Sequence, residues 1–336
     1  MSDLRHHGDV DAAPGLQDFA VNVRGSAPPD WLRKRLAAAI SRLGTYPSAQ
    51  DDRRAREQVA TRHGRDPDEV LILNGAAEGF ALLPSLHPKK AAVLHPSFTE
   101  PEVALRDAGV PVHQVMPGTQ VPEDADLVVI GNPTNPTSEL HPAATIRNHA
   151  RPGRVLVVDE AFMDAVPGEQ ESLAGTNTAG VLVLRSLTKT WALPGLRAGY
   201  ALGAPELLEQ LTRHRPHWPV GTLVLEAVTA CSEPRAVAEA EQAAEQQQRH
   251  REWLTKRLKD LPGVHVYEPA AAPFLLIRVS NGEHVRQRLR DRGIAVRRGD
   301  TFPGLTTDHL RVAVREPERC ENLLSALTEE LIDHGR

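Results

Sequence analysis

The chain has 336 residues, of which 40% are hydrophobic and 25% are charged, and its formal net charge at pH 7 is −5. This length predicts about two domains, and the negative charge argues against a general affinity for nucleic acid or for an acidic membrane. The two cysteines, Cys231 and Cys320, favour a reducing cytosol over a disulfide framework. The polar N-terminus lacks the apolar core of a signal peptide, and no apolar run approaches the ~18 residues of a membrane span. We therefore expect a cytoplasmic protein.

The first two hundred residues change from an irregular segment to regular α/β alternation. Residues 1–30 are polar with scattered glycine and proline, and residues 31–43 carry apolar side chains at helical spacing. Five short apolar runs then alternate with helical stretches. They are predicted as strands at Ala91–Leu94, Val110–Val115, Asp126–Ile130, Arg154–Val158 and Val181–Arg185. Because strands separated by helices form βαβ units, this pattern predicts a largely parallel sheet with helices on both faces.

The last hundred residues predict a smaller α/β unit. Residues 234–259 are rich in alanine, glutamate, glutamine and arginine and predict a long amphipathic helix. A strand at Leu275–Val279, a helix at His284–Arg292 and a strand at Arg311–Val314 follow. We therefore divide the chain into an N-terminal arm at 1–30, a large domain at 31–232 and a small domain at 233–336.

Three loops that follow predicted strands carry polar residues suited to chemistry. They contain Asn135, Asp159 and Lys189. Because functional groups of parallel sheets lie at the carboxyl ends of the strands, we expect these side chains to meet at one edge. Each has a simpler interpretation: a turn for Asn135, a helix cap for Asp159 and a surface position for Lys189. Three such coincidences along one edge are less favoured than a shared site, and no GxGxxG motif supports a dinucleotide site.

A fourth candidate is Asn74–Gly79, which follows the apolar stretch Val70–Leu73 and opens a predicted helix. Small residues there let backbone N–H groups approach a phosphate at the positive end of the helix dipole. A glycine-rich helix start is more often a simple turn. This segment therefore supports a phosphate site only in combination with the loops that contain Asn135, Asp159 and Lys189.

Together these motifs resemble the fold-type I aminotransferases, which depend on pyridoxal phosphate (PLP). Ser186–Lys189 with Pro194–Arg197 resembles the segment that carries the cofactor lysine. Asn132–Ser138 resembles the NPxNPTG loop, and Asp159–Phe162 resembles the strand end DEA(Y/F). Leu310-Arg311-Val312 resembles the segment of the carboxylate-binding arginine. The order and spacing agree from about His7 to Arg315, and the resemblance implies a large domain with a mainly parallel sheet between helices plus a smaller C-terminal α/β domain.

The resemblance also implies roles for individual residues. Lys189 would bind PLP as a Schiff base and shuttle protons, and Asp159 would keep the ring nitrogen protonated so that the ring works as an electron sink. Arg311 would bind the substrate carboxylate. The other implied cofactor contacts are Asn135 at the ring oxygen, Phe98 and Phe162 near the ring, and Ala76, Ala77, Ser186 and Arg197 at the phosphate. Tyr46 would reach the phosphate of a neighbouring subunit, which implies a homodimer.

Two branches of this family are close: histidinol-phosphate aminotransferase and the threonine-phosphate decarboxylase of cobalamin synthesis. The opening His6–Asp9, the segment Asp18–Val23 and Phe162 in DEAF favour the decarboxylase, although the opening lacks a second glycine. Residues in position for a phosphorylated substrate are His7, Asn22, Arg297, Arg298 and Arg315. For each of these basic residues a solvated surface role is as strong an interpretation.

The sequence therefore favours a PLP enzyme that decarboxylates threonine O-phosphate in cobalamin biosynthesis. The main alternative is an aminotransferase of the histidinol-phosphate type, because the two reactions differ in which substrate bond lies perpendicular to the ring. A non-catalytic regulator that reuses the fold is disfavoured, because only about 30 residues precede the first helix, no basic patch stands out, and both Lys189 and Asp159 are present. No metal is expected.

Overall fold

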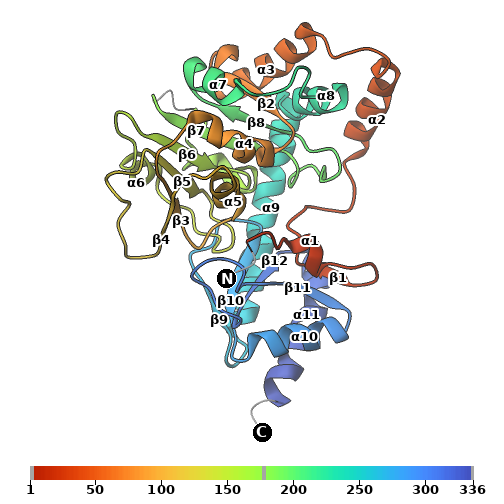
Figure 1. The fold of residues 1–336 in the computed structure, drawn as a ribbon. Coiled ribbons are helices and arrows are strands. Elements are labelled where there is room, and N and C mark those ends of the chain that lie inside the picture. Colours follow the sequence, from red (N-terminus) through yellow and green to blue (C-terminus); the bar gives the residue numbers. More distant parts are fainter. Residues whose placement is uncertain (1–3, 176–178, 334–336) are drawn as a thin grey trace.

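The computed structural model describes residues 4–175 and 179–333 (Figure 1). Within these residues, the larger sheet has seven strands in the order β2-β8-β7-β6-β5-β3-β4. The strands are β2 (Val70–Leu73), β3 (Ala91–Leu94), β4 (Val112–Val115), β5 (Leu127–Gly131), β6 (Val155–Asp159), β7 (Val181–Ser186) and β8 (Gly199–Leu202). The neighbours from β4 to β7 pair in parallel, whereas β8 is antiparallel to both β2 and β7. This sheet confirms the α/β prediction.

Helices cover both faces of the larger sheet, because its apolar side chains alternate between the faces along each strand. Along β6, Leu156 and Val158 pack in one hydrophobic cluster and Val157 packs in the other. The helices on the first face are α2 (Asp30–Ala39), α3 (Ala49–His63), α6 (Ala143–Arg147), α8 (Thr222–Cys231) and the start of α9 (Pro234–Lys259). Those on the second face are α4 (Ala76–Leu82), α5 (Glu100–Asp107) and α7 (Pro205–Thr212).

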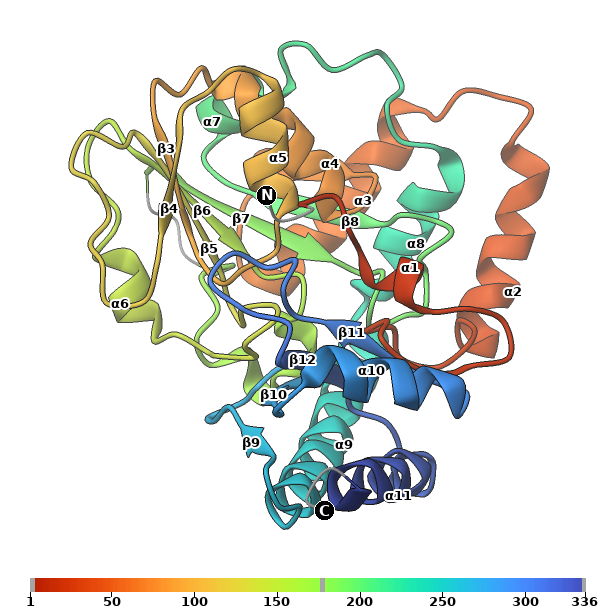
Figure 2. The ribbon, with the colours of Figure 1, turned by 60° about the horizontal axis from the view of Figure 1, so that its bottom comes forward.

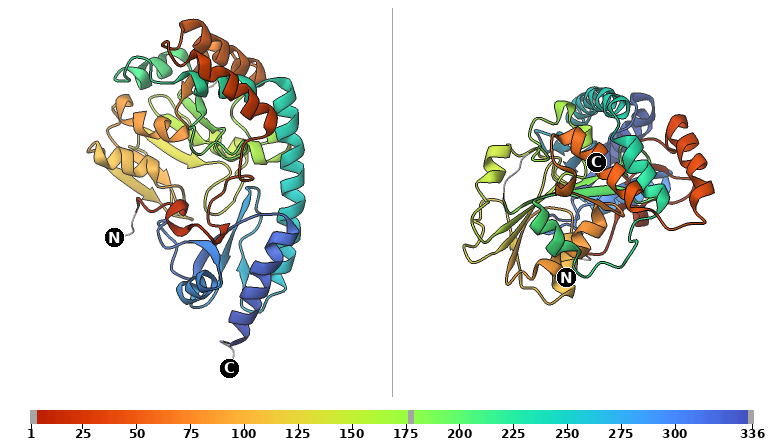
Figure 3. Two further views of the ribbon diagram at one scale, coloured as in Figure 1. Left: turned by 90° about the vertical axis from the view of Figure 1, so that its right-hand side faces the viewer. Right: turned by 90° about the horizontal axis from the view of Figure 1, so that it is seen from above.

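A second sheet lies below the first, and α9 runs along one side of the molecule past both (Figure 3). Within the described residues it has five strands in the order β1-β11-β12-β10-β9. They are β1 (Gln17–Phe19), β9 (His265–Val266), β10 (Phe274–Arg278), β11 (Ile294–Arg298) and β12 (His309–Ala313). The accompanying helices are α1 (Gly8–Asp11), α10 (Gly282–Asp291) and α11 (Pro317–Asp333). Short 3-10 helices lie at Ile40–Arg42, Pro67–Glu69, Leu83–Leu86, Met163–Ala165 and Pro167–Glu169.

The structure corrects the predicted elements at several points. The strand expected from Val110 begins at Val112, since Pro111 has no N–H with which to enter the ladder. Part of the expected arm is β1, which pairs in parallel with β11. Neither β11 nor β8 was predicted, because β11 ends in two arginines and β8 begins with a glycine, which obscure the apolar pattern of a strand. The division of the chain at residues 30 and 232 stays a prediction.

The ends of α3 illustrate how local sequence sets these bounds. Ser48 precedes the helix, its side chain accepts a hydrogen bond from the N–H of Asp51, and the Asp51 side chain returns one to the N–H of Ser48. Gly64 ends the helix in the left-handed conformation, with φ of 64°. In the described part of the chain, no helix has the length and apolar character needed to cross a membrane.

Candidate active site

A cavity of about 500 Å³ opens at the carboxyl ends of β5, β6 and β7, where the larger sheet faces β11 and β12. Figure 2 shows the N-terminal segment with α1 lying between α5 and β11 at this place. The sequence-predicted residues that line the cavity are His7, Asn22, Ala76, Ala77, Phe98, Asn135, Asp159, Phe162, Ser186, Lys189, Arg197, Arg297 and Arg311. The motifs expected to meet at one sheet edge therefore do meet there.

Asp159 ends β6 and is partly exposed where it lines the cavity. Its Oδ1 accepts one hydrogen bond from the N–H of Ala161 at 3.0 Å. Burial raises the pKa of Asp159 to about 6, the nearby Glu160 acts in the same direction, and the Ala161 N–H and Lys189 oppose the rise. The Asp159 carboxyl is therefore mostly ionised at neutral pH and faces the cavity with most of its hydrogen-bonding capacity free for a cationic group.

Lys189 lies three residues after the end of β7, and its carbonyl accepts a hydrogen bond from the N–H of Arg24 at 2.9 Å. Burial, together with the positive charges of Arg311 and Arg197, lowers the pKa of its ammonium group to about 8, and the carboxylates of Asp159 and Asp9 oppose the fall. A lysine with this pKa has an appreciable neutral fraction at pH 7, so its amine can attack an aldehyde.

Around Arg197 the backbone leaves room for an anion. Gly75 precedes α4 with a φ of 76°, and a Cβ there would lie 3.2 Å from the Arg197 guanidinium. A Cβ at Gly199 would lie 3.0 Å from the backbone nitrogen of Ala76, so glycine lets β8 approach the start of α4. The first N–H groups of a helix have no partner within the helix. Together with Ser186 and Arg197, which line the same cavity, they form a set of donors suited to a phosphate.

Thr188 is a site residue that the sequence reasoning missed. Its side chain is buried, it lines the cavity, and its Oγ1 has no hydrogen-bond partner within the described residues. An unsatisfied buried hydroxyl is costly, and a bound ligand or an ordered water at the cavity wall would supply its partner. The signal was present in the motif itself, because Thr188 stands directly before Lys189.

Arg311 comes from β12 and contacts the larger domain directly. Its guanidinium donates to Asn135 Oδ1 at 2.6 Å and to the carbonyl of Ala20, and a flipped Asn22 amide accepts from it at 3.1 Å. Burial lowers the pKa of Arg311 to about 9. These partners are all neutral, and no carboxylate of the described residues forms an ion pair with Arg311. The cavity therefore contains a cation that suits a carboxylate or a phosphate.

Three basic residues that were expected to contact the substrate form hydrogen bonds within the protein, and their role toward the substrate stays a prediction. Arg297 donates to Asp11, to the carbonyl of His6 and to Thr301. Arg315 lies outside the cavity lining and donates to the carbonyls of residues 18, 21 and 23 at 2.6 to 3.1 Å. Arg298, the third candidate, forms a two-point ion pair with Asp300. The arginines 297 and 315 hold the N-terminal segment beside the cavity.

Tyr46 does not reach the cavity of its own chain. It is 73% exposed and stacks on Trp218, with the ring centroids 4.4 Å apart. Ile40, Leu43 and Trp218 are also large apolar side chains with more than half of their surface exposed, at 56%, 52% and 58%. The expectation that Tyr46 serves a neighbouring subunit stays a prediction.

The chemistry of this donor set fits PLP. The cofactor presents an aldehyde, a basic ring nitrogen, a ring hydroxyl and a phosphate, and the cavity offers an amine of lowered pKa at Lys189 and a carboxylate at Asp159. Asn135 can face the ring hydroxyl, and the unsatisfied Thr188 hydroxyl with Arg197 can face the phosphate. The volume also lies within the range of small-molecule sites.

Replacing Thr188 with valine tests this fit. We expect Thr188→Val to weaken PLP binding about ten- to hundredfold, because a hydrogen bond to a charged group contributes about 1.5–3 kcal/mol. The free energy of unfolding of the cofactor-free protein should stay unchanged or rise, because valine removes an unsatisfied hydroxyl. Equilibrium PLP titration and urea unfolding measure the two effects. Thr188→Ser is the control that should bind PLP like the wild type, and equal PLP affinity for Thr188→Val would contradict the assignment.

The sequence matches the family described as "Aminotransferase class I and II" over residues 18–327. A histidinol-phosphate aminotransferase of Mycobacterium tuberculosis is 54% identical over 322 residues, which are 94% of this chain and 88% of the relative. A threonine-phosphate decarboxylase of Salmonella typhimurium is 29% identical over 344 residues, with 94% of this chain and 91% of the relative covered.

The fold agrees with these sequence relations. The crystal structure of histidinol-phosphate aminotransferase from Sinorhizobium meliloti in complex with pyridoxal-5'-phosphate has a TM-score of 0.79 to this chain, with 18% identity, and the likeness covers 93% of this chain and 90% of that one. At that identity it shows the fold. With a family match over most of its length and a relative above half identity, this chain belongs to the class I and II aminotransferase family of PLP-dependent enzymes.

Proposed function

We propose that this chain is an aminotransferase that acts on a small phosphorylated amino compound of the histidinol-phosphate kind. The observation that carries the proposal is the 54% identity, over 94% of the chain, to the mycobacterial protein of that name. The expected decarboxylation of threonine O-phosphate has weaker support, since the decarboxylase relative is 29% identical over the same share of the chain. Short motifs at the N-terminus and around Phe162 favoured the decarboxylase, whereas similarity along the whole chain favours the alternative.

Two side chains would do the chemical work that amino transfer requires of the protein. PLP, when bound, supplies an electron sink for charge that develops on the substrate carbon. Asp159, with a pKa of about 6, is ionised at neutral pH and would hold a proton on the ring nitrogen. Lys189, with a pKa of about 8, would take a proton from one carbon and return it to another.

Arg311 would bind the anionic group of each substrate in turn. Amino transfer uses an amino compound, here with a phosphate, and then an oxo acid with a carboxylate. A guanidinium suits both, because its planar fork binds either anion at two points, and Arg311 has neutral hydrogen-bond partners. His7 and Asn22 line the same cavity and would contact the rest of the substrate. Arg297 and Arg315 would act indirectly, by holding the N-terminal segment in place.

A second copy of the chain would cover the exposed apolar residues Ile40, Leu43, Tyr46 and Trp218. Exposed apolar patches on soluble proteins mark interaction sites, and these four side chains are each more than half exposed. Arg197, at the cavity, is also exposed in the single chain. A dimer in which Tyr46 of one copy approaches the phosphate donors of the other would account for both exposures.

The dimer can be tested with two changes at one residue. We expect the wild type to sediment as a dimer at micromolar concentration and Tyr46→Ala to dissociate more readily, because it loses the ring stacked on Trp218. Tyr46→Phe should keep the dimer, because the ring stacked on Trp218 remains. It should bind PLP more weakly, because the hydroxyl that would approach the phosphate is lost. Val10→Ala, at another exposed apolar residue, is the control that should change neither property. A monomeric wild type in sedimentation velocity would contradict the proposal.

The reaction is tested with purified holoenzyme, histidinol phosphate and 2-oxoglutarate. We expect glutamate and the oxo product to form in equal amounts, and no turnover without the oxo acid. Mass spectrometry of both products measures this.

Arg311→Lys should raise the KM for both substrates more than it lowers kcat, because one ammonium cannot replace a two-point fork.

The same preparation separates the two candidate reactions. Threonine O-phosphate is supplied without any oxo acid, and released carbon dioxide is measured. Sustained release over many turnovers, with no glutamate formed in the first assay, would contradict the aminotransferase and restore the decarboxylase. Activity toward neither substrate pair would leave the cofactor site standing but overturn the proposed substrate class.

A further inference from the structure

We propose that Glu160 and Arg185 form a buried positioning pair that holds Asp159 and the Ser186–Lys189 segment in register at the cavity edge. This inference rests on the cofactor role of Asp159 proposed above. Glu160 directly follows Asp159, and Arg185 directly precedes Ser186. Glu160 and Arg185 are each only 1% exposed to solvent, and neither lines the cavity.

The backbone places the two side chains of residues 159 and 160 on opposite sides of the sheet edge. The N–H of Glu160 donates to the carbonyl of Leu184 at 2.9 Å, and the carbonyl of Asp159 accepts from the N–H of Asn132 at 2.8 Å. The ladder therefore continues through both residues, and consecutive side chains of a strand point to opposite faces. Asp159 faces the cavity, so Glu160 points into the protein behind it.

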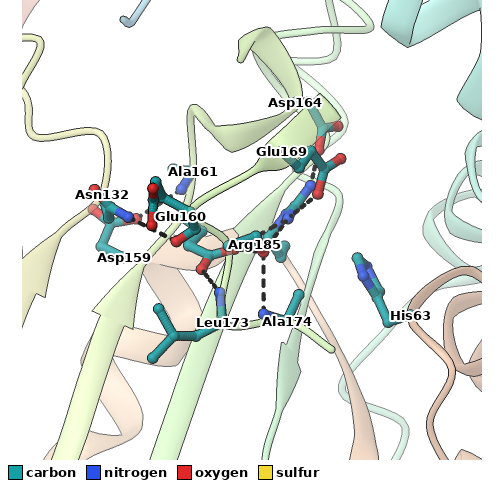
Figure 4. Close-up of polar contacts among 12 residues, drawn as sticks. His63, Asn132, Asp159, Glu160, Ala161, Asp164, Glu169, Leu173, Ala174 and Arg185 are labelled. Atoms are coloured by element: carbon teal, nitrogen blue, oxygen red, sulfur yellow. Dashed lines mark hydrogen bonds and ion pairs between the residues drawn. The ribbon is translucent and has the colours of Figure 1, made fainter. Parts of the chain in front are cut away.

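Glu160 is held there by three donors. Its carboxylate accepts from the N–H of Leu173 at 2.6 Å, from the hydroxyl of Ser172 at 2.6 Å and from Arg185 at 3.1 Å. Burial raises the pKa of Glu160, and these donors oppose that rise. Figure 4 shows Glu160 between Asp159 on one side and Arg185 on the other.

Arg185 extends the connection to a wider ionic cluster on the same face. Its guanidinium donates to Glu169 at 2.7 Å and to Asp164, and Arg62 donates to the same two carboxylates at 2.7 and 3.0 Å. Burial opposes the charge of Arg185, but the acidic neighbours outweigh it and raise its pKa. Arg185 therefore stays charged and fixed, and it links the strand end of β6 to that of β7.

Stability alone is a weak explanation for this arrangement. A buried ion pair adds little net stability, because desolvation of both charges offsets their attraction, whereas removal of one partner is costly. By contrast, the side chain of Asp159 has a single hydrogen bond to the described residues, which it accepts from a backbone N–H two residues away. The direction of its carboxylate therefore depends on the backbone at 159–161, and Glu160 is the residue that anchors this backbone. At metal sites, residues that orient the ligands in this way typically change affinity or activity ten- to hundredfold when replaced, and we expect an effect of the same kind here.

The test compares Glu160→Gln with Glu169→Gln in the holoenzyme. Both changes keep the side-chain shape and remove one carboxylate beside Arg185, but Glu169 lies ten residues from Asp159 in sequence and does not adjoin it. PLP labelled with 15N at its ring nitrogen reports by NMR whether that nitrogen is protonated. We expect Glu160→Gln to move the resonance toward the unprotonated position and to raise the PLP dissociation constant about tenfold. Glu169→Gln should match the wild type in both.

Two further variants separate the possible failures. Arg185→Lys should shift the 15N resonance in the same direction as Glu160→Gln but by less, because an ammonium can keep one of the contacts. Thermal unfolding of the cofactor-free proteins shows whether each variant still folds. Asp159→Asn tests the underlying role, and an unchanged 15N resonance there would overturn the cofactor role of Asp159. The positioning role of Glu160 and Arg185 is refuted if Asp159→Asn shifts the resonance but folded Glu160→Gln does not. It is also refuted if Glu169→Gln shifts the resonance as much as Glu160→Gln. In both cases the cofactor role of Asp159 still stands.

Discussion

The site depends on the burial of a carboxylate, Asp159, and an ammonium group, Lys189, in one cavity at the edge of the larger sheet. Burial raises the pKa of Asp159 to about 6 and lowers that of Lys189 to about 8. The same low-dielectric surroundings act in opposite directions because the charged form of each group is disfavoured. As a result, near neutral pH the acid is still mainly a carboxylate and the amine is already partly neutral. Cofactor binding and proton transfer both require these two states.

The cavity also depends on how the smaller sheet is joined to the larger one. Arg311 reaches from β12 to Asn135 on the loop after β5, and Arg297 and Arg315 hold the N-terminal segment by its backbone carbonyls and by Asp11. His7 closes the other side, with Nε2 at 2.6 Å from Glu100 at the start of α5. The N-terminal segment therefore contacts both parts of the fold and forms one wall of the site.

Short-range sequence patterns predicted the central strands and the loops that follow them, because apolar runs and the polar residues after them are local features. The unpartnered hydroxyl of Thr188 and the Glu160–Arg185 ion pair could not be predicted, although all three residues stand in or beside the recognised motifs, since such contacts become visible only once distant segments are packed together. The pairing of β1 with β11 is similarly long-range. The contacts of Arg297 and Arg315 with the N-terminal segment are likewise long-range, so their charge alone suggested a substrate phosphate and gave no sign of these hydrogen bonds. The choice of reaction was based on a few short motifs, whereas similarity over the whole chain favours amino transfer.

The pH dependence of PLP capture by the cofactor-free protein tests the central claim most directly. Below about pH 8 Lys189 is mainly an ammonium ion, and above about pH 8 it is mainly a neutral amine. After PLP is added, the rate at which the visible absorbance of bound PLP appears should therefore rise roughly tenfold between pH 7 and pH 9 and level off at higher pH. Lys189→Arg should give no such band at any pH. A midpoint near 10.5, the ordinary value for lysine, would show that the cavity does not lower the pKa of Lys189 and would contradict the account.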